Sequence, residues 1–336
     1  MEVGNGNNIT DAQGVQWLDM LSGILNVSLG HGSSVVANAL AEVIMSGLVN
    51  TYDRHGENRR ALVDLLHTYD GRFVWKLVNT GAEAVERAIQ VVSENLGRLP
   101  RIAVLSRSFH GKSISMSSTR YDVPWGNPLN ITVLDPQKDI LPDFDMLFYE
   151  PIKGWDGNMP DEELLRQLCD KRGAYLVADE MITGFLRCGK RFLNKTADIV
   201  ISGKGLAQGV PLAVLGIKAQ HNPHKFTIGW NSTCAGNNLS ATVGLRVLQY
   251  LISKETEIRT KVLKCEMELS SMGFTAQGAL GFKRMVRPQS EMRFVFEQNR
   301  VVASWHDTFI RVGPSFITEQ KELDKLRQVL KLAEND

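Results

Sequence analysis

The chain has 336 residues, of which 43% are hydrophobic and 22% are charged, and its formal net charge is +1. This length suits one large domain and a smaller one. The near-zero net charge, without a basic block, argues against a nucleic-acid-binding surface that works by electrostatic attraction. No apolar run approaches the roughly 20 residues of a membrane span, and the polar N-terminus shows no signal peptide.

Four cysteines, Cys169, Cys188, Cys234 and Cys265, show neither a CxxC pair nor metal-ligand spacing. They are therefore expected to be free thiols in a reducing compartment, which predicts a cytoplasmic protein without a metal site. The usual nucleotide and hydrolase motifs are also missing. The sequence has no G-x-G-x-x-G after a strand, no Walker A loop, no HExxH and no G-x-S-x-G.

Residues 79–92, with the sequence NTGAEAVERAIQVV, predict a capped helix. Thr80 and Glu83 form an S/T-x-x-E capping box, and apolar residues follow at helical spacing. Gly81 lies in the first turn, where a glycine lets a ligand approach the backbone and the exposed N–H groups attract an anion. The segment predicts either a phosphate-binding site or only a well-capped helix, and taken alone it favours the second.

Short apolar runs recur between residues 102 and 216, and polar or helical segments separate several of them. The runs are IAVLS (102–106), ITVLD (131–135), MLFYE (146–150), AYLVADE (174–180), DIVISG (198–203) and PLAVLG (211–216). This alternation predicts an α/β fold with a mostly parallel sheet that helices cover on both faces.

Three of these runs end in an acid, namely Asp135, Glu150 and Asp179. In open α/β sheets, ligands bind beyond the carboxyl ends of the strands, so acids there are candidates for a site. A strand-end acid is about equally often a turn former. Lys204 lies between two glycines at the end of another run, although an unpaired lysine is costly to bury.

After residue 240 the pattern changes. A long helical stretch (about 240–271) precedes strand-like runs at EMRFVFE (291–297) and TFIRVG (308–313) and a final helix. We expect a large domain at 46–240 and a small α+β domain that combines 1–45 with 241–336.

Lys204, Asp179 and the helix that starts near Gly81 together match the needs of pyridoxal 5'-phosphate. A desolvated lysine can form a Schiff base with the aldehyde, and a carboxylate can keep the pyridine nitrogen protonated. A helix N-terminus can hold the phosphate. Each feature has an ordinary structural explanation, but their joint occurrence in this order is far less expected by chance.

The chain resembles the class III aminotransferases, which are pyridoxal-phosphate enzymes of fold type I. Several segments carry the resemblance: NTGAEAVERAI, SFHGKS, EPIKGWDGNMP, ADEMITGFLRCGK, SGKGLAQGVPL and NSTCAGNNLSA. The combination is specific, whereas no single segment is. The resemblance implies a fold-type I α/β enzyme that moves an amino group between an amine and a keto acid or aldehyde by a ping-pong mechanism.

The resemblance also implies roles for individual residues. Lys204 would carry the cofactor as a Schiff base and shuttle the proton, and Asp179 would pair with the pyridine nitrogen. Thr233 would reach the phosphate in a neighbouring subunit, which makes a homodimer with shared sites the minimal active unit. The other implied cofactor contacts are Gly81, Ala82, Phe109, His110, Glu150 and Ile182, and the implied substrate contacts are Arg311, Trp155 and Tyr52.

Two departures from the family pattern bear on the substrate. Ile182 stands where many members have a glutamine that touches the cofactor, and Trp155 replaces a glutamate that pairs with the arginine in ornithine-type enzymes. Arg311 would therefore lack its masking partner. A decarboxylase and an aminomutase of the same fold remain alternatives, because they would share Lys204 and Asp179. A cofactor-free scaffold is a further alternative.

Overall fold

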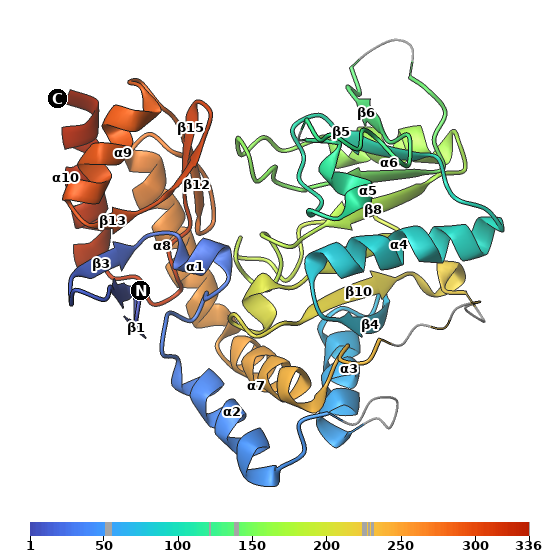
Figure 1. Cartoon of the computed structure of the whole chain (residues 1–336), viewed down its shortest axis with the longest axis horizontal. Coiled ribbons are helices and arrows are strands. Elements are labelled where there is room, and N and C mark those ends of the chain that lie inside the picture. The colour runs from blue at the N-terminus through green and yellow to red at the C-terminus, as the bar shows by residue number, and fades with distance from the viewer. Residues whose placement is uncertain are drawn as a thin grey trace.

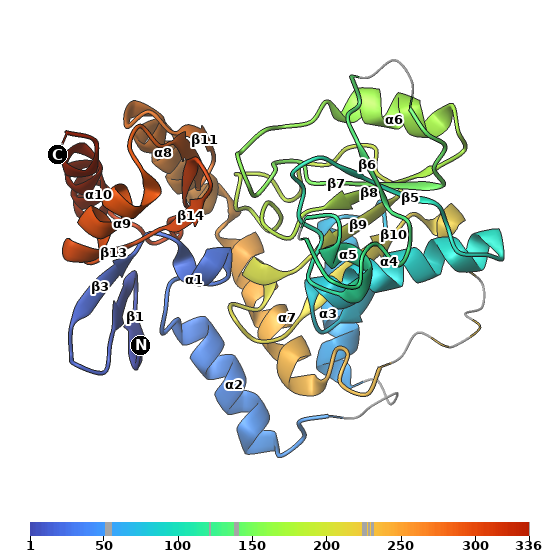
Figure 2. The same ribbon diagram turned by 45° about the horizontal axis from the view of Figure 1, so that its top comes forward.

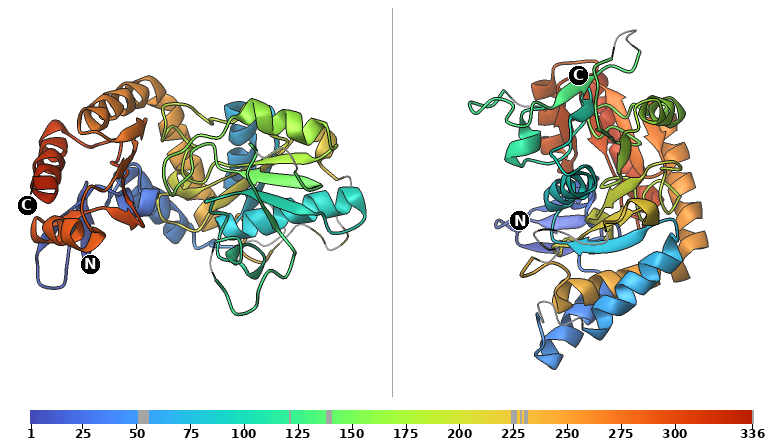
Figure 3. Two further views of the ribbon diagram at one scale, coloured as in Figure 1. Left: turned by 90° about the horizontal axis from the view of Figure 1, so that it is seen from above. Right: turned by 90° about the vertical axis from the view of Figure 1, so that its right-hand side faces the viewer.

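The computed structural model describes residues 1–50, 56–120, 122–137, 141–223, 227, 229 and 232–335. The middle of the chain forms a large sheet with its covering helices, and the segments nearest the two termini gather on the other side of the molecule (Figures 1 and 3). No helix in these ranges is both long enough and apolar enough to cross a membrane.

The large sheet has seven strands. In spatial order they are β4 (Val74–Val78), β10 (Ala213–Ile217), β9 (Ile199–Ser202), β8 (Tyr175–Asp179), β7 (Met146–Tyr149), β5 (Ile102–Leu105) and β6 (Thr132–Leu134). Only β10 runs antiparallel to its neighbours, and the remaining pairs are parallel. The predicted α/β fold with a mostly parallel sheet is therefore confirmed.

Helices cover both faces of this sheet, because successive side chains of a strand point to opposite faces. On β10, Ala213 and Leu215 share a core cluster with α4 (Gly81–Leu96), whereas Val214 belongs to the cluster that contains residues of α3 (Glu57–Tyr69) and α7 (Asn238–Ser253). A strand that is buried on both faces appears in the sequence as a continuous apolar run, which is why such strands could be predicted. The other helices beside the sheet are α5 (Ile114–Ser117) and α6 (Glu162–Asp170).

Two four-stranded sheets lie apart from the large one. The first has the order β1 (Val3–Asn5), β2 (Asn8–Thr10), β3 (Gln16–Asp19) and β13 (Val301–Val302), and the second has the order β11 (Thr275–Gln277), β12 (Leu280–Arg284), β15 (Phe309–Val312) and β14 (Ser304–His306). Since β13 pairs with β3, the N-terminal segment joins the C-terminal one in a single sheet. The division into a large domain at 46–240 and a small domain that combines 1–45 with 241–336 stays a prediction.

The remaining helices are α1 (Ser22–Leu25), α2 (Ser34–Ser46), α8 (Glu255–Ser271), α9 (Gln289–Gln298) and α10 (Gln320–Asn335). The helix α2 packs along α7, as Figures 1 and 2 show from two directions. The predicted helical stretch at 240–271 is two helices, α7 and α8, which meet at Lys254. The strand at 309–312 and the final helix agree with their predictions.

The strand-like reading of residues 291–297 was wrong, because this segment lies within α9. Its buried side chains are Met292 and Phe296, four residues apart on one helical face, and Phe294 between them is exposed. Aromatic and β-branched residues favour strands in general, but tertiary packing of this apolar face decides here for a helix.

Candidate active site

A pocket of about 210 Å³ lies where three strands of the large sheet end, beside the first turn of α4. Its lining residues are Gly81, Ala82, Phe109, His110, Gly111, Glu150, Asp179, Met181, Ile182 and Lys204. The structure thus brings together every residue that the sequence assigned to the cofactor except Thr233. Their roles toward a cofactor stay predictions.

Lys204 directly follows the end of β9 and begins a short 3₁₀ turn, η1 (Lys204–Leu206). The preceding Gly203 packs so closely that an added Cβ would come within 2.9 Å of the Met181 side chain. Burial lowers the pKa of Lys204 to about 8, and the charge of Arg311 acts in the same direction. The Lys204 amine makes no hydrogen bond to another residue in the described ranges, so it can serve as a nucleophile at near-neutral pH.

Asp179 is the last residue of β8, and its carboxylate is held by two donors. One oxygen, Oδ2, lies 2.9 Å from Nδ1 of His110, and the other, Oδ1, accepts the backbone N–H of Met181 at 3.2 Å. Because a carboxylate only accepts, Nδ1 of His110 is the donor. The His110 Nε2 atom is buried and has no partner among the described residues. The carboxylate is thereby oriented within the pocket.

The first turn of α4 presents unpaired backbone donors to the pocket. The side-chain oxygen of Thr80 caps the helix by accepting a hydrogen bond from the Glu83 N–H at 3.1 Å. The Glu83 carboxylate in turn accepts the N–H of Asn79, whereas in a standard capping box it would accept the N–H of Thr80. Within the described ranges, the N–H groups of Gly81 and Ala82 donate to no other residue. Unpaired N–H groups at a helix N-terminus, together with the helix dipole, suit a phosphate.

Glu150 follows β7 and ties two loops to the pocket. Its carboxylate accepts the N–H of Phe109 at 2.9 Å and that of Gly154 at 3.1 Å. Burial raises the pKa of Glu150 to about 7, while the charge of His110 opposes this shift. Glu150 therefore fixes the position of Phe109 on one wall of the pocket.

Arg311 comes from β15 of a different sheet, and it reaches the same loop. Its Nη1 donates to the carbonyl oxygen of Gly154 at 2.7 Å, and its Nη2 lies 3.4 Å from Oγ of Ser304. Burial lowers the pKa of Arg311 to about 10, although the charge of Glu150 partly offsets this. The Nε atom is buried without a partner, and Arg311 forms no ion pair with an acid in the described part of the chain. A buried guanidinium in this state suits an incoming carboxylate.

Two further predicted residues, Trp155 and Thr233, do not line this pocket. Trp155 lies beyond Gly154 and packs under the guanidinium of Arg120, 3.8 Å from the ring centroid. Thr233 is exposed on a turn before α7, where its carbonyl oxygen accepts a bond from Asn50. Tyr52 lies outside the described residues.

Sequence reasoning missed two lining residues, Gly111 and Met181. Gly111 has φ +99°, and an added Cβ would come within 3.2 Å of the Ala82 Cβ. Its place in the segment FHGKS was the available signal. The residue type of Met181 suggests no role in a site. Its position two residues after Asp179 was the available signal.

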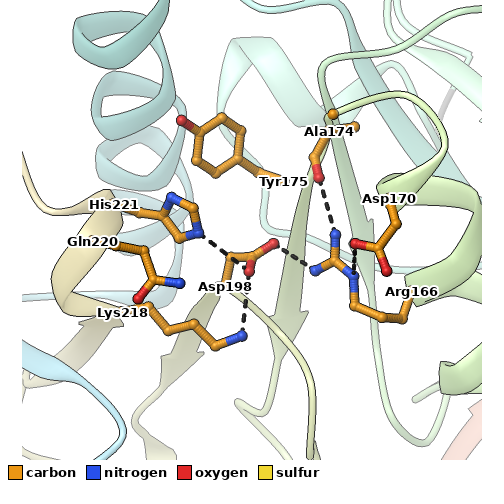
Figure 4. Close-up of a pocket in the computed structure, with 9 residues that line it drawn as sticks. Arg166, Asp170, Ala174, Tyr175, Asp198, Lys218, Gln220 and His221 are labelled. Carbon is orange, nitrogen blue, oxygen red and sulfur yellow. Dashed lines mark hydrogen bonds and ion pairs between the residues drawn. The ribbon is translucent and has the colours of Figure 1, made fainter.

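A second pocket surrounds Asp198, which directly precedes β9, so this pocket lies at the amino ends of the strands (Figure 4). Asp198 is bound by Arg166 at 2.6 Å, Lys218 at 3.3 Å and His221 at 3.4 Å. Burial raises the pKa of this carboxyl, but hydrogen bonds from His221, the Leu176 N–H and Arg166 outweigh it and hold the pKa well below its usual range. Because the charges in this network neutralise one another, we interpret it as stabilising the fold at the amino ends of the strands.

The groups of the Lys204 pocket fit pyridoxal phosphate. The amine of Lys204 is held at the end of a strand, the Asp179 carboxylate is oriented by His110, and unpaired N–H groups face the pocket from α4. These are a nucleophile for the aldehyde, an acceptor for the ring N–H and an anion site, respectively.

Comparisons with known proteins agree with this arrangement. The sequence pattern of the family "Aminotransferase class-III" matches residues 1–129 and 145–333. The acetylornithine aminotransferase of Archaeoglobus fulgidus is 24% identical over 98% of this chain and 94% of its own length. The ornithine aminotransferase 2 of Staphylococcus saprophyticus is 28% identical over 94% of this chain and 89% of its own.

Solved structures share the fold. The S-selective transaminase from Bacillus megaterium superposes with a TM-score of 0.88 at 17% identity, covering 100% of this chain and 92% of that one. The ornithine aminotransferase from Toxoplasma gondii gives a TM-score of 0.80 at 19% identity, over 98% of this chain and 89% of that one.

Proposed function

Because the chain belongs to the class III aminotransferase family, whose members depend on pyridoxal phosphate, we propose that it transfers an amino group between two small molecules. The donor is an amine or amino acid, the acceptor is a keto acid or aldehyde, and the two react in turn by a ping-pong mechanism. The observation that carries this proposal is the meeting of Lys204, Asp179 and the start of α4 in one pocket.

Besides Lys204, several residues of the pocket would hold the cofactor. The N–H groups of Gly81 and Ala82 would bind the phosphate, and Phe109 would pack against one ring face with Ile182 in the same pocket. Asp179 would accept the ring N–H. Bound pyridoxal phosphate supplies an aldehyde that takes up amines and a ring that withdraws electrons from the substrate.

Lys204 is the residue that moves the proton. Its lowered pKa leaves roughly a tenth of the amine neutral at pH 7, far more than for an ordinary lysine, so the same group can accept and return a proton at the substrate carbon. Asp179, which its contact with His110 orients within the pocket, would accept a hydrogen bond from the proton-bearing nitrogen of the ring. Arg311 would bind a substrate carboxylate and so orient the carbon that reacts.

We further infer that the active unit is a homodimer. Thr233 is exposed and lies in a segment rich in asparagine, serine and glycine, which is unsuited to a core. A side chain that lies away from the pocket of its own chain can complete the pocket of a second copy, where it would reach the phosphate.

An amine-donor screen on the purified protein loaded with pyridoxal phosphate tests the function. We expect at least one amine to convert the absorbance of the bound cofactor to that of the pyridoxamine form, and a keto acid or aldehyde to reverse the change. The keto acceptor should be consumed in step with the donor. Release of carbon dioxide, or migration of the amine without acceptor consumption, would favour the decarboxylase or the aminomutase instead.

Borohydride reduction tests the assignment of the lysine. Reduction should trap the cofactor on the wild-type protein and on Lys261→Ala, a control in an exposed i,i+4 ion pair with Glu257. Lys204→Ala should trap none. Cofactor trapped at another lysine in that variant would refute the assignment.

A further inference from the structure

The turn that carries Lys204 holds two non-glycine residues in the left-handed backbone conformation. Lys204 itself has φ +27°, and Gln208, four residues later, has φ +52°. Residues with a side chain rarely adopt this conformation, because their Cβ comes too close to a carbonyl oxygen, and they keep it only where other contacts hold them. Contacts around the turn must therefore hold it in place.

Gln208 makes such contacts with its side chain, which is only 7% exposed. Its Nε2 donates to the carbonyl oxygen of Gly205 at 2.6 Å and to Oγ of Ser28 at 2.8 Å. Its Oε1 accepts the backbone N–H of Leu29 at 2.8 Å. Glutamine is mostly exposed in proteins, so a buried glutamine whose amide nitrogen and oxygen are both bonded indicates that these bonds matter at this position.

The partners of the Gln208 amide fix its orientation. A backbone N–H only donates and a carbonyl oxygen only accepts, so Oε1 must face Leu29 and Nε2 must face Gly205. If the oxygen and the nitrogen were exchanged, both contacts would become repulsive. The amide therefore fits between the turn and its partners in one orientation.

These bonds attach the lysine turn to the N-terminal segment of the chain. Ser28 and Leu29 lie 180 and 179 residues before Gln208. Ser28 is itself fixed, because it is buried and its carbonyl oxygen accepts the N–H of Phe316 at 2.8 Å. The turn also approaches Ser28 directly, since a Cβ added to Gly205 would lie 3.3 Å from Oγ of Ser28. The N-terminal segment thus forms the support on which the turn rests.

Gln208 reaches Lys204 through Gly205, the residue that directly follows the lysine. Its bond to the Gly205 carbonyl adds to the bond inside the turn, which the N–H of Leu206 donates to the carbonyl oxygen of Gly203 at 2.7 Å. The Lys204 amine makes no hydrogen bond to another described residue. The position of the amine therefore depends on the backbone of the turn.

We infer that Gln208 is a positioning residue for Lys204: its amide fixes the turn against the N-terminal segment and so keeps the amine buried at the pocket. The inference rests on the proposed aminotransferase function, since it concerns the residue that would carry the cofactor and move the proton. A loosened turn would let water reach the amine and would let the amine move away from the reacting carbon.

The charged groups that act on the amine stay in place when Gln208 is replaced. They are Arg311, Asp179, Glu150 and Arg187. None of them hydrogen-bonds to Gln208 in the part of the chain that the structure describes. Burial is the largest of the influences that lower the pKa of Lys204, so a changed pKa in a variant of Gln208 would report how well the amine is buried.

Uptake of pyridoxal phosphate by the cofactor-free protein tests the inference through its dependence on pH. In the wild type the rate should reach half its maximum near pH 8. Gln208→Met keeps the length of the side chain but none of its hydrogen bonds. We expect its half-maximum to move up by roughly one pH unit, because the pKa of a less buried amine is nearer to that of an ordinary lysine.

Steady-state kinetics supply a second measurement. If Lys204 moves the proton, a displaced amine slows the chemical step more than it weakens substrate binding. In Gln208→Met, kcat should therefore fall at least about 10-fold, whereas KM should stay within about threefold of the wild-type value.

Two further variants separate the role of the amide from an effect on the backbone. Glycine adopts a φ of +52° without strain, so Gln208→Gly removes the side chain and leaves the turn free of backbone strain at this position. Its half-maximum should shift as that of Gln208→Met does. Ser28→Ala removes one of the three contacts, so it should shift the half-maximum in the same direction by a smaller amount.

Asn7→Leu is the matched control. Asn7 is also a buried amide, and it bonds to Glu322 at 2.8 Å and to Oγ of Ser315 at 2.5 Å, outside the Lys204 pocket. Urea unfolding should show that Asn7→Leu is less stable than the wild type. Its half-maximum should nevertheless stay near pH 8 and its kcat within about twofold of the wild type, because a general loss of stability does not displace the amine.

The outcomes separate this inference from the function itself. If Gln208→Met and Gln208→Gly keep the half-maximum near pH 8, or if Asn7→Leu shifts it equally, Gln208 only supports the fold and the inference is refuted. If no amine converts the bound cofactor, the aminotransferase proposal fails, while the pH profile of cofactor uptake still decides whether Gln208 positions Lys204.

Discussion

The side chains of His110 and Asp179 meet 2.9 Å apart, although 69 residues separate them in the chain. Both side chains are buried. His110 contacts one carboxylate oxygen of Asp179, and the Met181 N–H donates to the other. A buried imidazole that donates to a carboxylate fixes the orientation of that carboxylate.

Removing the charge of Asp179 should therefore reduce turnover more than it weakens cofactor binding. We expect Asp179→Asn to bind some cofactor and to lose at least ~10²-fold in turnover, the scale of a lost electrostatic contribution to catalysis. Asp135→Asn is the matched control, because Asp135 also follows a strand but only caps the backbone of Gln137. Stopped-flow half-reactions would measure both, and near-normal turnover in Asp179→Asn would contradict the assigned role.

The lowered pKa of Lys204 predicts a pH profile for cofactor attachment. Only the neutral amine attacks the aldehyde, so the rate at which cofactor-free protein takes up pyridoxal phosphate should rise with pH, reach half its maximum near pH 8 and level off about one pH unit higher. With an ordinary lysine, whose pKa is about 10.4, the rate of uptake would still be rising at pH 10. The charge of Asp179 raises this pKa, so in Asp179→Asn the profile should move to lower pH. A rate that still climbs above pH 9 in the wild type would argue against a buried amine.

Arg311→Lys tests the carboxylate contact beside the reacting carbon. Loss of a bidentate charge-assisted contact costs about 1.5–3 kcal/mol, so kcat/KM for carboxylate-bearing donors should fall roughly 10- to 100-fold. Donors without a carboxylate should change much less. Equal losses for both kinds of donor would instead indicate that Arg311, through its bond to the Gly154 carbonyl, only holds the loop in place.

Complementation tests the shared site. Lys204→Ala and Thr233→Val should each be impaired alone, whereas a mixture that exchanges subunits should regain activity. Each hybrid dimer would contain one pocket with an intact Lys204 and an intact Thr233. Light scattering would establish the mass, and a fully active monomer would exclude this arrangement.

The network around Asp198 predicts a pH-dependent contribution to stability. Asp198→Asn should lower the free energy of unfolding at pH 7 by about 3 kcal/mol, because it removes the largely buried carboxylate that Arg166 and Lys218 share. The pKa of Asp198 is depressed in the folded protein, so this stabilisation is present above pH ~4 and is lost as the pH falls below that. Urea unfolding at pH 7 and pH 3 would show the difference. Asp170→Asn, which removes an exposed partner of the same arginine, should cost less than about 1 kcal/mol.

Much of the fold could be predicted from local patterns. Strands β5, β7, β9 and β10 of the large sheet are buried on both faces, so they appear as apolar runs. The N-cap bond between Thr80 and the Glu83 N–H follows from residues three apart. The segment 291–297 shows the limit of this reasoning. Its apolar residues fit a strand or a helix, and only the packing of Met292 and Phe296 decides for α9.

The sequence by itself determined the family resemblance, the order along the chain of most strands and helices in its middle part, and the residues around Lys204 other than Gly111 and Met181. These follow from short segments whose residue types each suit one local structure or one chemical task. The tertiary structure alone decided that Arg311 bonds to Gly154, 157 residues away, and that Trp155 lies between Arg120 and His306. Such contacts join segments from different sheets, and they depend on how whole elements pack, for which no local periodicity in the sequence exists.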